Sequence, residues 1–252
     1  MKRIPTIAPL LCVLGAMELV VRRQWVPAYL LPSPTQIVHA FGEFSALLLR
    51  ATRQTGSAAL IGFLLSLGLG IGLACLLSGS RTLERLFYPY AVFFQTVPII
   101  SIAPLLVIWF GYGMPTVIAS AVICSFFPVL ANTLLGLRST DPALVDLFRL
   151  YGARPSQRFW GLRFPFALPQ ILAGARIAAG LAVIGAIVGE FITGGGLGSV
   201  VDTARSQLKI DLVFAAVIAA SVLGLGFYWA IEWISRRSLR HWHASEKVQN
   251  PR

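Results

Sequence analysis

TGSAALIGFLLSLGLGIGLACLLS, residues 55–78, is a run of 24 residues without a charged side chain. An α-helix needs about 20 mostly apolar residues to cross the hydrocarbon core of a bilayer. The stretch therefore predicts a transmembrane helix, and with it a membrane-bound fold.

The composition of the whole chain supports the same class. Of its 252 residues, 56% are hydrophobic and only 12% are charged, whereas a soluble domain is about 25% charged. The net charge of +11 comes from basic residues that lie between apolar runs and not on one polar face. Transmembrane proteins show this arrangement because basic residues stay in the cytoplasm, so the charge does not indicate a nucleic-acid partner.

Five further apolar runs have the length or composition of a span. The expected spans are residues 4–21, 55–78, 87–110, 115–135, 168–189 and 212–234. Lys2 and Arg3 precede the first run as in a signal peptide, but Glu18 interrupts its end and no small-residue cleavage site follows. We therefore expect a retained first helix and an all-α, polytopic bundle of six transmembrane helices.

The third run differs from the others because it contains three prolines, Pro89, Pro98 and Pro104. A proline leaves backbone carbonyls without a partner, which is tolerated in a membrane mainly where protein or a cavity supplies one. We expect this span to be kinked or broken and to face the protein interior.

The basic residues also predict the orientation. If both termini are cytoplasmic, the inner segments carry 14 Lys and Arg and the outer loops carry 6. This bias favours the cytoplasmic assignment for both termini. The chain then divides into a first helix with a periplasmic interfacial segment (1–54, amphipathic over 35–49), a permease core (55–235) and a basic cytoplasmic tail (236–252).

Pairs of glycines at helical spacing predict close contacts between helices. Gly68 and Gly72 form one pair, and Gly185 and Gly189 form another. Small residues four apart let two helix backbones approach.

The cytoplasmic segment 136–165, between the fourth and fifth spans, predicts a short amphipathic helix. Asp141 and Pro142 are typical of a helix start, and Gly152 is typical of a C-terminal turn. One apolar face would contain Leu144, Leu147, Phe148 and Tyr151. A second short helix is expected over 156–164, before Pro165. The first helix could lie on lipid headgroups or dock into a groove of a cytoplasmic partner.

A resemblance favours docking. Asp146-Leu147-Phe148, then Gly152, then Leu168-Pro169, resembles the EAA loop of ABC importer permeases, a pattern of Glu-Ala-Ala, three residues, Gly and a later Leu-Pro. Asp146 stands for Glu, and Leu147 and Phe148 stand for the two alanines. The bulkier face implies a partner groove adjusted to match.

Other segments resemble the nitrate, sulfonate and taurine branch of these binding-protein-dependent permeases, in order along nearly the whole chain. They are residues 31–34 (LPSP), 95–98 (QTVP), 103–111 (APLLVIWFG), 189–190 (GE) and 196–198 (GLG). Residues 18–22 (ELVVR) and 27–32 (PAYLLP) also resemble permeases for thiamine pyrimidine precursors and riboflavin. The resemblance thus implies a nutrient importer and leaves these cargo classes open.

The family resemblance implies the rest of the machine. It comprises a second permease copy, two ATP-binding cassette ATPase subunits and a periplasmic or lipid-anchored solute-binding protein, in the bacterial cytoplasmic (inner) membrane. None of the three lysines lies in a GxxxxGK[ST] phosphate-binding loop, so we expect no cofactor in this chain and ATP–Mg in the partner ATPase. The implied ATPase-coupling residues are Asp146, Leu147, Phe148, Tyr151, Gly152, Ala153, Pro165 and Pro169.

Polar and proline residues near the broken span are candidates for the translocation pathway. The set is Gln95, Pro98, Ser101, Pro104 and Glu190. Each has a simpler interpretation: the polar groups can cap freed carbonyls, and Glu190, beside the Gly194–Gly196 turn or gate, can be an interfacial carboxylate in water. Arg176, in the fifth span, is expected to snorkel to the cytoplasmic side unless it pairs with a neighbour.

Two other classes of protein fit the sequence less well. A secondary transporter or channel would need several buried charges or a repeated ion motif. An enzyme would need a cluster of His, carboxylate or thiol groups, but His39, His241 and His243 lie in loops or the tail. We therefore expect no catalytic residues and no metal site.

Overall fold

The computed structural model is helical throughout the residues that it describes, 7–27 and 30–239. Residues 4–6 of the expected first span and residues 240–252 of the tail, including His241 and His243, lie outside this part of the chain. The helices are α1 (Ile7–Arg22), α2 (Pro34–Glu43), α3 (Ser45–Ser78), α4 (Arg81–Thr96), α5 (Ile99–Phe110), α6 (Met114–Arg138), α7 (Pro142–Leu150), α8 (Pro155–Arg158), a π-helical turn (Phe159–Arg163), α9 (Phe164–Thr193), α10 (Gly196–Ser206) and α11 (Ile210–Leu239).

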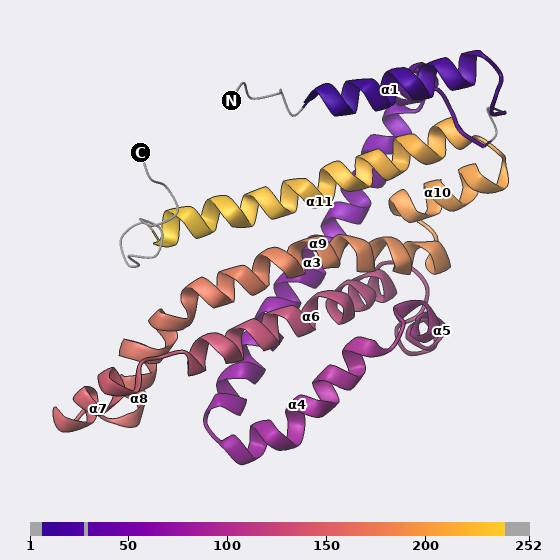
Figure 1. Cartoon of the computed structure of the whole chain (residues 1–252). Helices are drawn as coiled ribbons and strands as arrows, with labels where there is room; N and C mark the ends of the chain where they lie inside the picture. The colour runs from indigo at the N-terminus through magenta and orange to yellow at the C-terminus, as the bar shows by residue number, and fades with distance from the viewer. Residues whose placement is uncertain (1–6, 28–29, 240–252) are drawn as a thin grey trace.

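Among the helices of residues 7–27 and 30–239, four are long and apolar enough to cross a membrane. They are α3, α6, the continuous helix Pro155–Thr193 that contains α9, and α11, and they confirm the second, fourth, fifth and sixth expected spans. In Figure 1, α6, α9 and α11 run alongside one another and α3 crosses them. Helices α7 and α8 project at one end of this bundle, and α10 lies at the other end.

The expected third span is broken, as its prolines predict. Val97 takes an extended conformation (φ −72°, ψ 123°) between α4 and α5. A residue before proline is pushed out of the helical region by the proline ring, and Val97 precedes Pro98. Pro89 and Pro104 lie inside α4 and α5, so only one of the three prolines ends a helix.

The broken segment does not face the interior of the single chain, contrary to expectation. None of the described side chains of α4 is buried, and α5 buries only Ala103 and Leu106. Large apolar side chains such as Ile108 and Trp109 are 75% and 66% exposed. The face that the sequence predicts to be covered is therefore unpartnered within one copy of the chain.

Two element boundaries differ from the sequence analysis. Helix α3 begins at Ser45 and not at residue 55, because no glycine or proline interrupts residues 45–55 and the charges of Arg50 and Arg53 are tolerated on its exposed face. As a result the amphipathic segment 35–49 is divided between α2 and α3. Helix α1 has 16 residues and is shorter than the four clear spans.

The most extensive helix packing joins α6 to α9 along a stripe of small residues. A Cβ atom added at Gly185 would lie 2.6 Å from the Ser120 carbonyl oxygen and 2.8 Å from Ala121 Cα. One added at Gly174 would lie 2.7 Å from Asn132 Cβ. Only glycine at these positions permits the two backbones to approach so closely.

The predicted glycine pairs are only half right. Gly185 and Gly189 both contact α6, as expected. A Cβ at Gly68 or Gly72 would meet no atom within 4 Å, so that pair lies at no helix contact. On α3 the close contacts to α6 are made by Gly62 and Gly70, which are eight residues apart. The spacing of four residues therefore predicted close helix packing on α3 but placed it on the wrong pair of glycines.

The α6–α9 contact predicts a difference between two glycines of one helix. Gly185→Ala should lower the free energy of unfolding by about 1–3 kcal/mol, because the added methyl group overpacks the contact. Gly180→Ala is the matched control: its Cβ would meet nothing within 4 Å, and the change should be neutral or slightly stabilising. Thermal unfolding of both variants in one detergent measures the difference, and equal effects would contradict the packing account.

Candidate functional site

The chain leaves the bundle between α6 and α9 and forms a compact tip. Asp141 caps α7 by accepting a hydrogen bond from the Ala143 N–H at 2.9 Å, and Pro142 occupies the first turn. Both features match the helix start that the sequence predicts. We call residues 141–163 the tip, and Figure 1 shows it at the lower left of the bundle.

The apolar face that the sequence predicts on α7 lies mostly in solvent. Val145 is buried, and Phe148 is half-buried with its ring above Gly161. Leu147 and Tyr151, which the sequence places on the face with Phe148, are exposed. The helix therefore buries Val145 and part of Phe148 and leaves its other apolar side chains in solvent.

The solvent-facing side is the tip's most unusual feature. Leu150 is 86% exposed, Tyr151 is 84% exposed, and Leu147 and Trp160 add further apolar surface. We call these four residues the exposed apolar patch. Leu150 and Trp160 were not among the predicted coupling residues, because the resemblance to the EAA loop does not extend to them. Leu147, Leu150 and Tyr151 are neighbours on the helix surface at spacings of three and four residues, and exposed apolar surface of this kind is typical of a site that binds a partner.

The end of α7 is a tightly bonded turn. Gly152 has φ of +72°, its N–H donates to the Arg149 carbonyl at 2.9 Å, and the Ala153 N–H donates to the Phe148 carbonyl at 3.0 Å. This pair of hydrogen bonds is a Schellman motif, which requires a left-handed residue at the position of Gly152. The predicted C-terminal turn is confirmed. Asp146 is paired with Arg149, at 2.9 Å on the exposed surface.

The second half of the tip continues directly into α9 and is not a separate helix ended by Pro165. The Phe164 N–H donates to the Phe159 carbonyl, five residues back, and so forms the π turn. Pro165 has no N–H to donate, and the wider turn just before it accommodates the proline without ending the helix. The rings of Trp160 and Phe164 pack with centroids 5.2 Å apart, and Pro169 lies further along α9.

The predicted pathway residues fall into two separate places. Gln95, Pro98, Ser101 and Pro104 are all exposed on the α4–α5 face. Thr96 Oγ1 donates to the Phe93 carbonyl at 2.8 Å, which is the carbonyl-capping role that the sequence analysis considered.

Glu190 lies elsewhere, enclosed among α3, α9 and α10. Its side chain is 1% exposed, so the expectation of an interfacial carboxylate in water is wrong. Glu190 Oε2 accepts hydrogen bonds from Thr55 Oγ1 and from the Gly198 N–H, both at 2.9 Å. Glu190 is buried because α10 folds back over the end of α9 and covers the carboxylate, a contact between segments that the local sequence does not reveal.

Side chains from two other helices cap the start of α10. Besides the Glu190 bond, Thr55 Oγ1 accepts from the Leu197 N–H at 2.9 Å, and Gln54 Oε1 accepts from the Gly196 N–H at 3.1 Å. Three successive N–H groups are thus satisfied by α3 and α9, and the carboxylate faces the positive end of the α10 dipole. The glycines at 194–196 all have positive φ and form the turn between α9 and α10.

Arg176 has a partner on a neighbouring helix. It forms an ion pair with Glu232 of α11, and Glu232 Oε1 also accepts from Arg236 Nε at 2.9 Å. The two spans are therefore joined by a charged contact that the sequence offered only as the weaker alternative.

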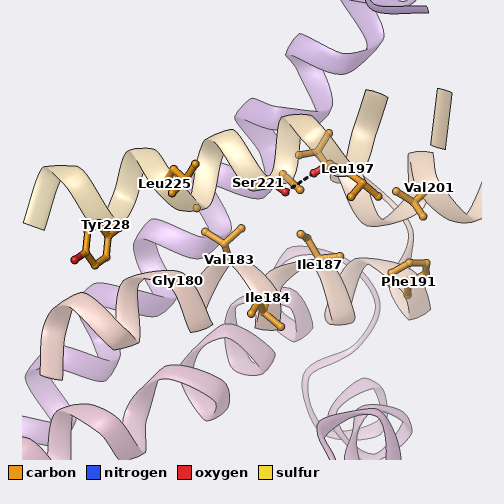
Figure 2. Close-up of a pocket in the computed structure, with 13 residues that line it drawn as sticks. Gly180, Val183, Ile184, Ile187, Phe191, Leu197, Val201, Ser221, Leu225 and Tyr228 are labelled. Carbon is orange, nitrogen blue, oxygen red and sulfur yellow. Dashed lines mark hydrogen bonds between the residues drawn. The ribbon is translucent and has the colours of Figure 1, made fainter. Parts of the chain in front are cut away.

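Figure 2 shows an apolar groove of about 540 Å³ between α9, α10 and α11. Ser221 donates its hydroxyl to the Val217 carbonyl of its own helix at 2.9 Å. The Tyr228 hydroxyl is then the one other polar side-chain group in the lining. Sites for polar solutes have several convergent polar groups, so this groove is not built to hold one.

Comparisons with known proteins agree with one another. A family model described as "Binding-protein-dependent transport system inner membrane component" matches residues 66–240. The formylaminopyrimidine transport permease protein ThiX of Halalkalibacterium halodurans is 42% identical over 202 residues, 79% of this chain and 81% of that protein. The riboflavin transport system permease protein RibX of Chloroflexus aurantiacus is 35% identical over 222 residues, 87% and 82% of the two chains.

More distant relatives extend the range. The taurine transport system permease protein TauC of Escherichia coli is 30% identical over 177 residues, 70% of this chain and 63% of that protein. Among solved structures, a chain of the MetNI methionine ABC transporter in an inward-facing conformation superposes with a TM-score of 0.68 over 77% of this chain and 97% of that chain. Its identity is 18%, so this likeness concerns the fold.

The hydrogen bonds that cap α10 predict the effect of removing the Thr55 hydroxyl. Thr55→Val keeps the shape of the side chain but leaves the Leu197 N–H and one acceptor site of Glu190 without a partner. This should cost about 1–3 kcal/mol of stability per buried group. Thr52→Val is the matched control, since Thr52 lies one turn earlier on α3 and no side-chain hydrogen bond of it occurs among the described residues. Thermal unfolding tests the pair, and an unchanged Thr55→Val would show that the cap does not hold α10.

Proposed function

The chain belongs to the family of binding-protein-dependent transport system inner membrane components, the permease subunits of ABC importers, and from that premise we propose how its parts operate in such a machine. Two copies of the chain form the membrane channel, two ATPase subunits bind on the cytoplasmic side, and a periplasmic or lipid-anchored solute-binding protein delivers the cargo. ATP–Mg is bound and hydrolysed by the ATPase subunits and not by this chain.

We assign six membrane crossings, made by α1, α3, the α4–α5 pair, α6, α9 and α11, with both termini in the cytoplasm. The excess of Lys and Arg in the corresponding inner segments supports this orientation. The division into a first helix with a periplasmic segment (1–54), a core (55–235) and a tail (236–252) follows from it. The tip is then cytoplasmic and α10 is periplasmic.

The observation that carries the proposal is the exposed apolar patch on the tip. Leu150 and Tyr151 face solvent almost completely, on a turn that hydrogen bonds hold rigidly. In the proposed orientation this patch lies in the cytoplasm, where an apolar helix surface fits a hydrophobic groove of a partner protein. We propose that the partner is the ATPase subunit. The docking segment includes Asp146, Leu147, Phe148, Tyr151, Gly152 and Ala153, and Pro165 and Pro169 connect it to the span.

We propose that the unpartnered α4–α5 face meets the same face of a second copy and forms the pathway with it. The exposed positions of Gln95, Pro98, Ser101 and Pro104 support this assignment. Glu190, which the sequence analysis placed on the pathway, has an indirect part here: it holds α10 in position beside the outer end.

The proposed cargo is a small nutrient of the sulfonate, taurine or nitrate type, with a thiamine pyrimidine precursor or riboflavin as the alternative. Relatives at 30% to 42% identity are named for transport of taurine, riboflavin and formylaminopyrimidine, so these names do not single out one cargo. In a machine of this design the solute-binding protein supplies most of the selection.

A transport assay tests the proposed energy source. The purified chain is reconstituted in proteoliposomes with and without its ATPase subunit, and uptake of labelled taurine, riboflavin and formylaminopyrimidine is measured in the presence of the binding protein. Uptake of one probe should require both ATP and the ATPase subunit. Robust gradient-driven uptake without the ATPase would contradict the proposal and favour a secondary transporter.

Gly152 provides a test of coupling. Gly152→Val forces a β-branched residue into the left-handed region at a cost of about 1–2 kcal/mol, which corresponds to a roughly five- to thirtyfold smaller population of the docking conformation. We expect ATP-driven transport to fall by that factor while ATP hydrolysis continues. A Cβ at this position would meet no atom within 4 Å, so the effect comes from the backbone alone. Gly152→Asn, which tolerates the left-handed region, should retain transport. Normal transport by Gly152→Val would contradict the coupling role.

A further inference from the structure

Four arginines converge where α3 ends, α4 begins and α6 ends. Arg81 and Arg85 lie in the first turns of α4, Arg138 is the last residue of α6, and Arg163 ends the π turn. They line two adjoining cavities of about 350 and 440 Å³, and Arg81 and Arg138 belong to the lining of both. Both cavities lie at the tip end of the bundle, and residues of α4 line each of them.

The positive charge of this region is not balanced within the described part of the chain. Glu84 forms an ion pair with Arg138, and among residues 7–27 and 30–239 no carboxylate pairs with Arg81, Arg85 or Arg163. Arg81 is close enough to Arg138 for the two guanidinium groups to repel each other. The residues that line the larger cavity include three arginines and no acid. Like charges gathered in this way are stabilised by an anion between them.

A buried hydroxyl group also points to a ligand in the larger cavity. Thr140 lines this cavity, is 8% exposed, and its Oγ1 has no hydrogen-bond partner among the described residues. Ser78, the other hydroxyl in the lining, already donates to the Cys75 carbonyl at 2.8 Å. A buried polar group without a partner is costly, so the Thr140 hydroxyl calls for an acceptor that the chain itself does not supply.

We propose that this cavity, the arginine pocket formed by Arg81, Arg138, Thr140 and Arg163, binds a phosphate group. Guanidinium groups pair with phosphate oxygens through two parallel hydrogen bonds, and a hydroxyl donates to a further oxygen. A phosphate offers enough acceptors for all of these donors at once, whereas a single carboxylate offers two oxygens. The phosphate can belong to a phospholipid headgroup of the inner leaflet or to a soluble phosphate compound.

The position of the pocket gives the bound phosphate a defined consequence. Its lining joins the α3–α4 turn and the end of α6 to Val145 of α7 and to Arg163 of the π turn. A ligand there connects the membrane bundle to the tip and stabilises the orientation in which the exposed apolar patch is presented. This inference goes beyond the proposed function, and the binding can be measured without any transport assay.

Two arms of one experiment distinguish the sources of phosphate. The full chain is purified and delipidated in detergent, and its thermal unfolding temperature is measured with increasing inorganic phosphate. In the second arm it is placed in nanodiscs of phosphatidylcholine with or without phosphatidylglycerol, and retained lipid is counted by native mass spectrometry. A ligand that binds only the folded state raises the unfolding temperature as its concentration increases.

The variants are chosen to separate binding from folding. Arg163→Gln should weaken binding roughly tenfold, since a charged hydrogen bond contributes about 1.4 kcal/mol or more and that energy corresponds to a factor of ten. Thr140→Val removes a hydroxyl that has no partner in the chain, so it should fold normally and bind several-fold more weakly. Arg205→Gln, an exposed arginine of α10 paired with Asp202, is the control and should bind like the unaltered chain.

Each outcome decides the proposal. An effect of inorganic phosphate alone identifies a soluble ligand, and an effect of phosphatidylglycerol alone identifies a lipid; either supports the phosphate site if the pocket variants lose it. No effect in either arm, or pocket variants that bind as well as the control, overturns it. If Arg163→Gln fails to fold, Thr140→Val still gives the answer.

Discussion

The close approach of α6 and α9 is the constraint on which the rest of the structure depends. In a bilayer the surrounding lipid is as apolar as the side chains, so helices associate through tight packing and hydrogen bonds. Gly174 and Gly185 permit this packing because any side chain there would collide with Asn132 or with the Ser120 backbone. The tip begins where α6 ends and rejoins α9, and Glu190 lies at the opposite end of the same helix. One contact therefore fixes the geometry of both ends.

The two ends are built in different ways that suit different tasks. At the outer end, α10 is held by three side chains, which accept hydrogen bonds from its first three N–H groups. At the tip, the backbone is equally well bonded, but Leu150 and Tyr151 are left in solvent. A rigid backbone that presents unsatisfied apolar surface is suited to docking, because little conformational entropy is lost when a partner covers it.

Local sequence signals predicted the features that depend on neighbouring residues. The four long spans, the helix break at Pro98 and the turn at Gly152 follow from hydropathy, proline sterics and glycine conformation, and the structure confirms them. The features that were predicted wrongly depend on contacts between segments that are distant in the sequence. The enclosure of Glu190 requires α10 to fold over α9. The side of α7 that faces solvent depends on which of its residues are covered by other segments of the chain. The choice of Gly62 and Gly70 over Gly68 and Gly72 depends on how α3 crosses α6.

Site-specific photo-crosslinking measures the central claim most directly, namely that the tip meets the ATPase subunit. A photoreactive residue is placed at position 150 in the tip or at position 208 near α10, in the chain assembled with its ATPase. Both positions are exposed leucines at opposite ends of the bundle, 86% and 70% exposed. The account predicts a crosslink to the ATPase subunit from position 150 and none from position 208. An assembled complex that crosslinks from position 208, or not at all from position 150, would contradict it.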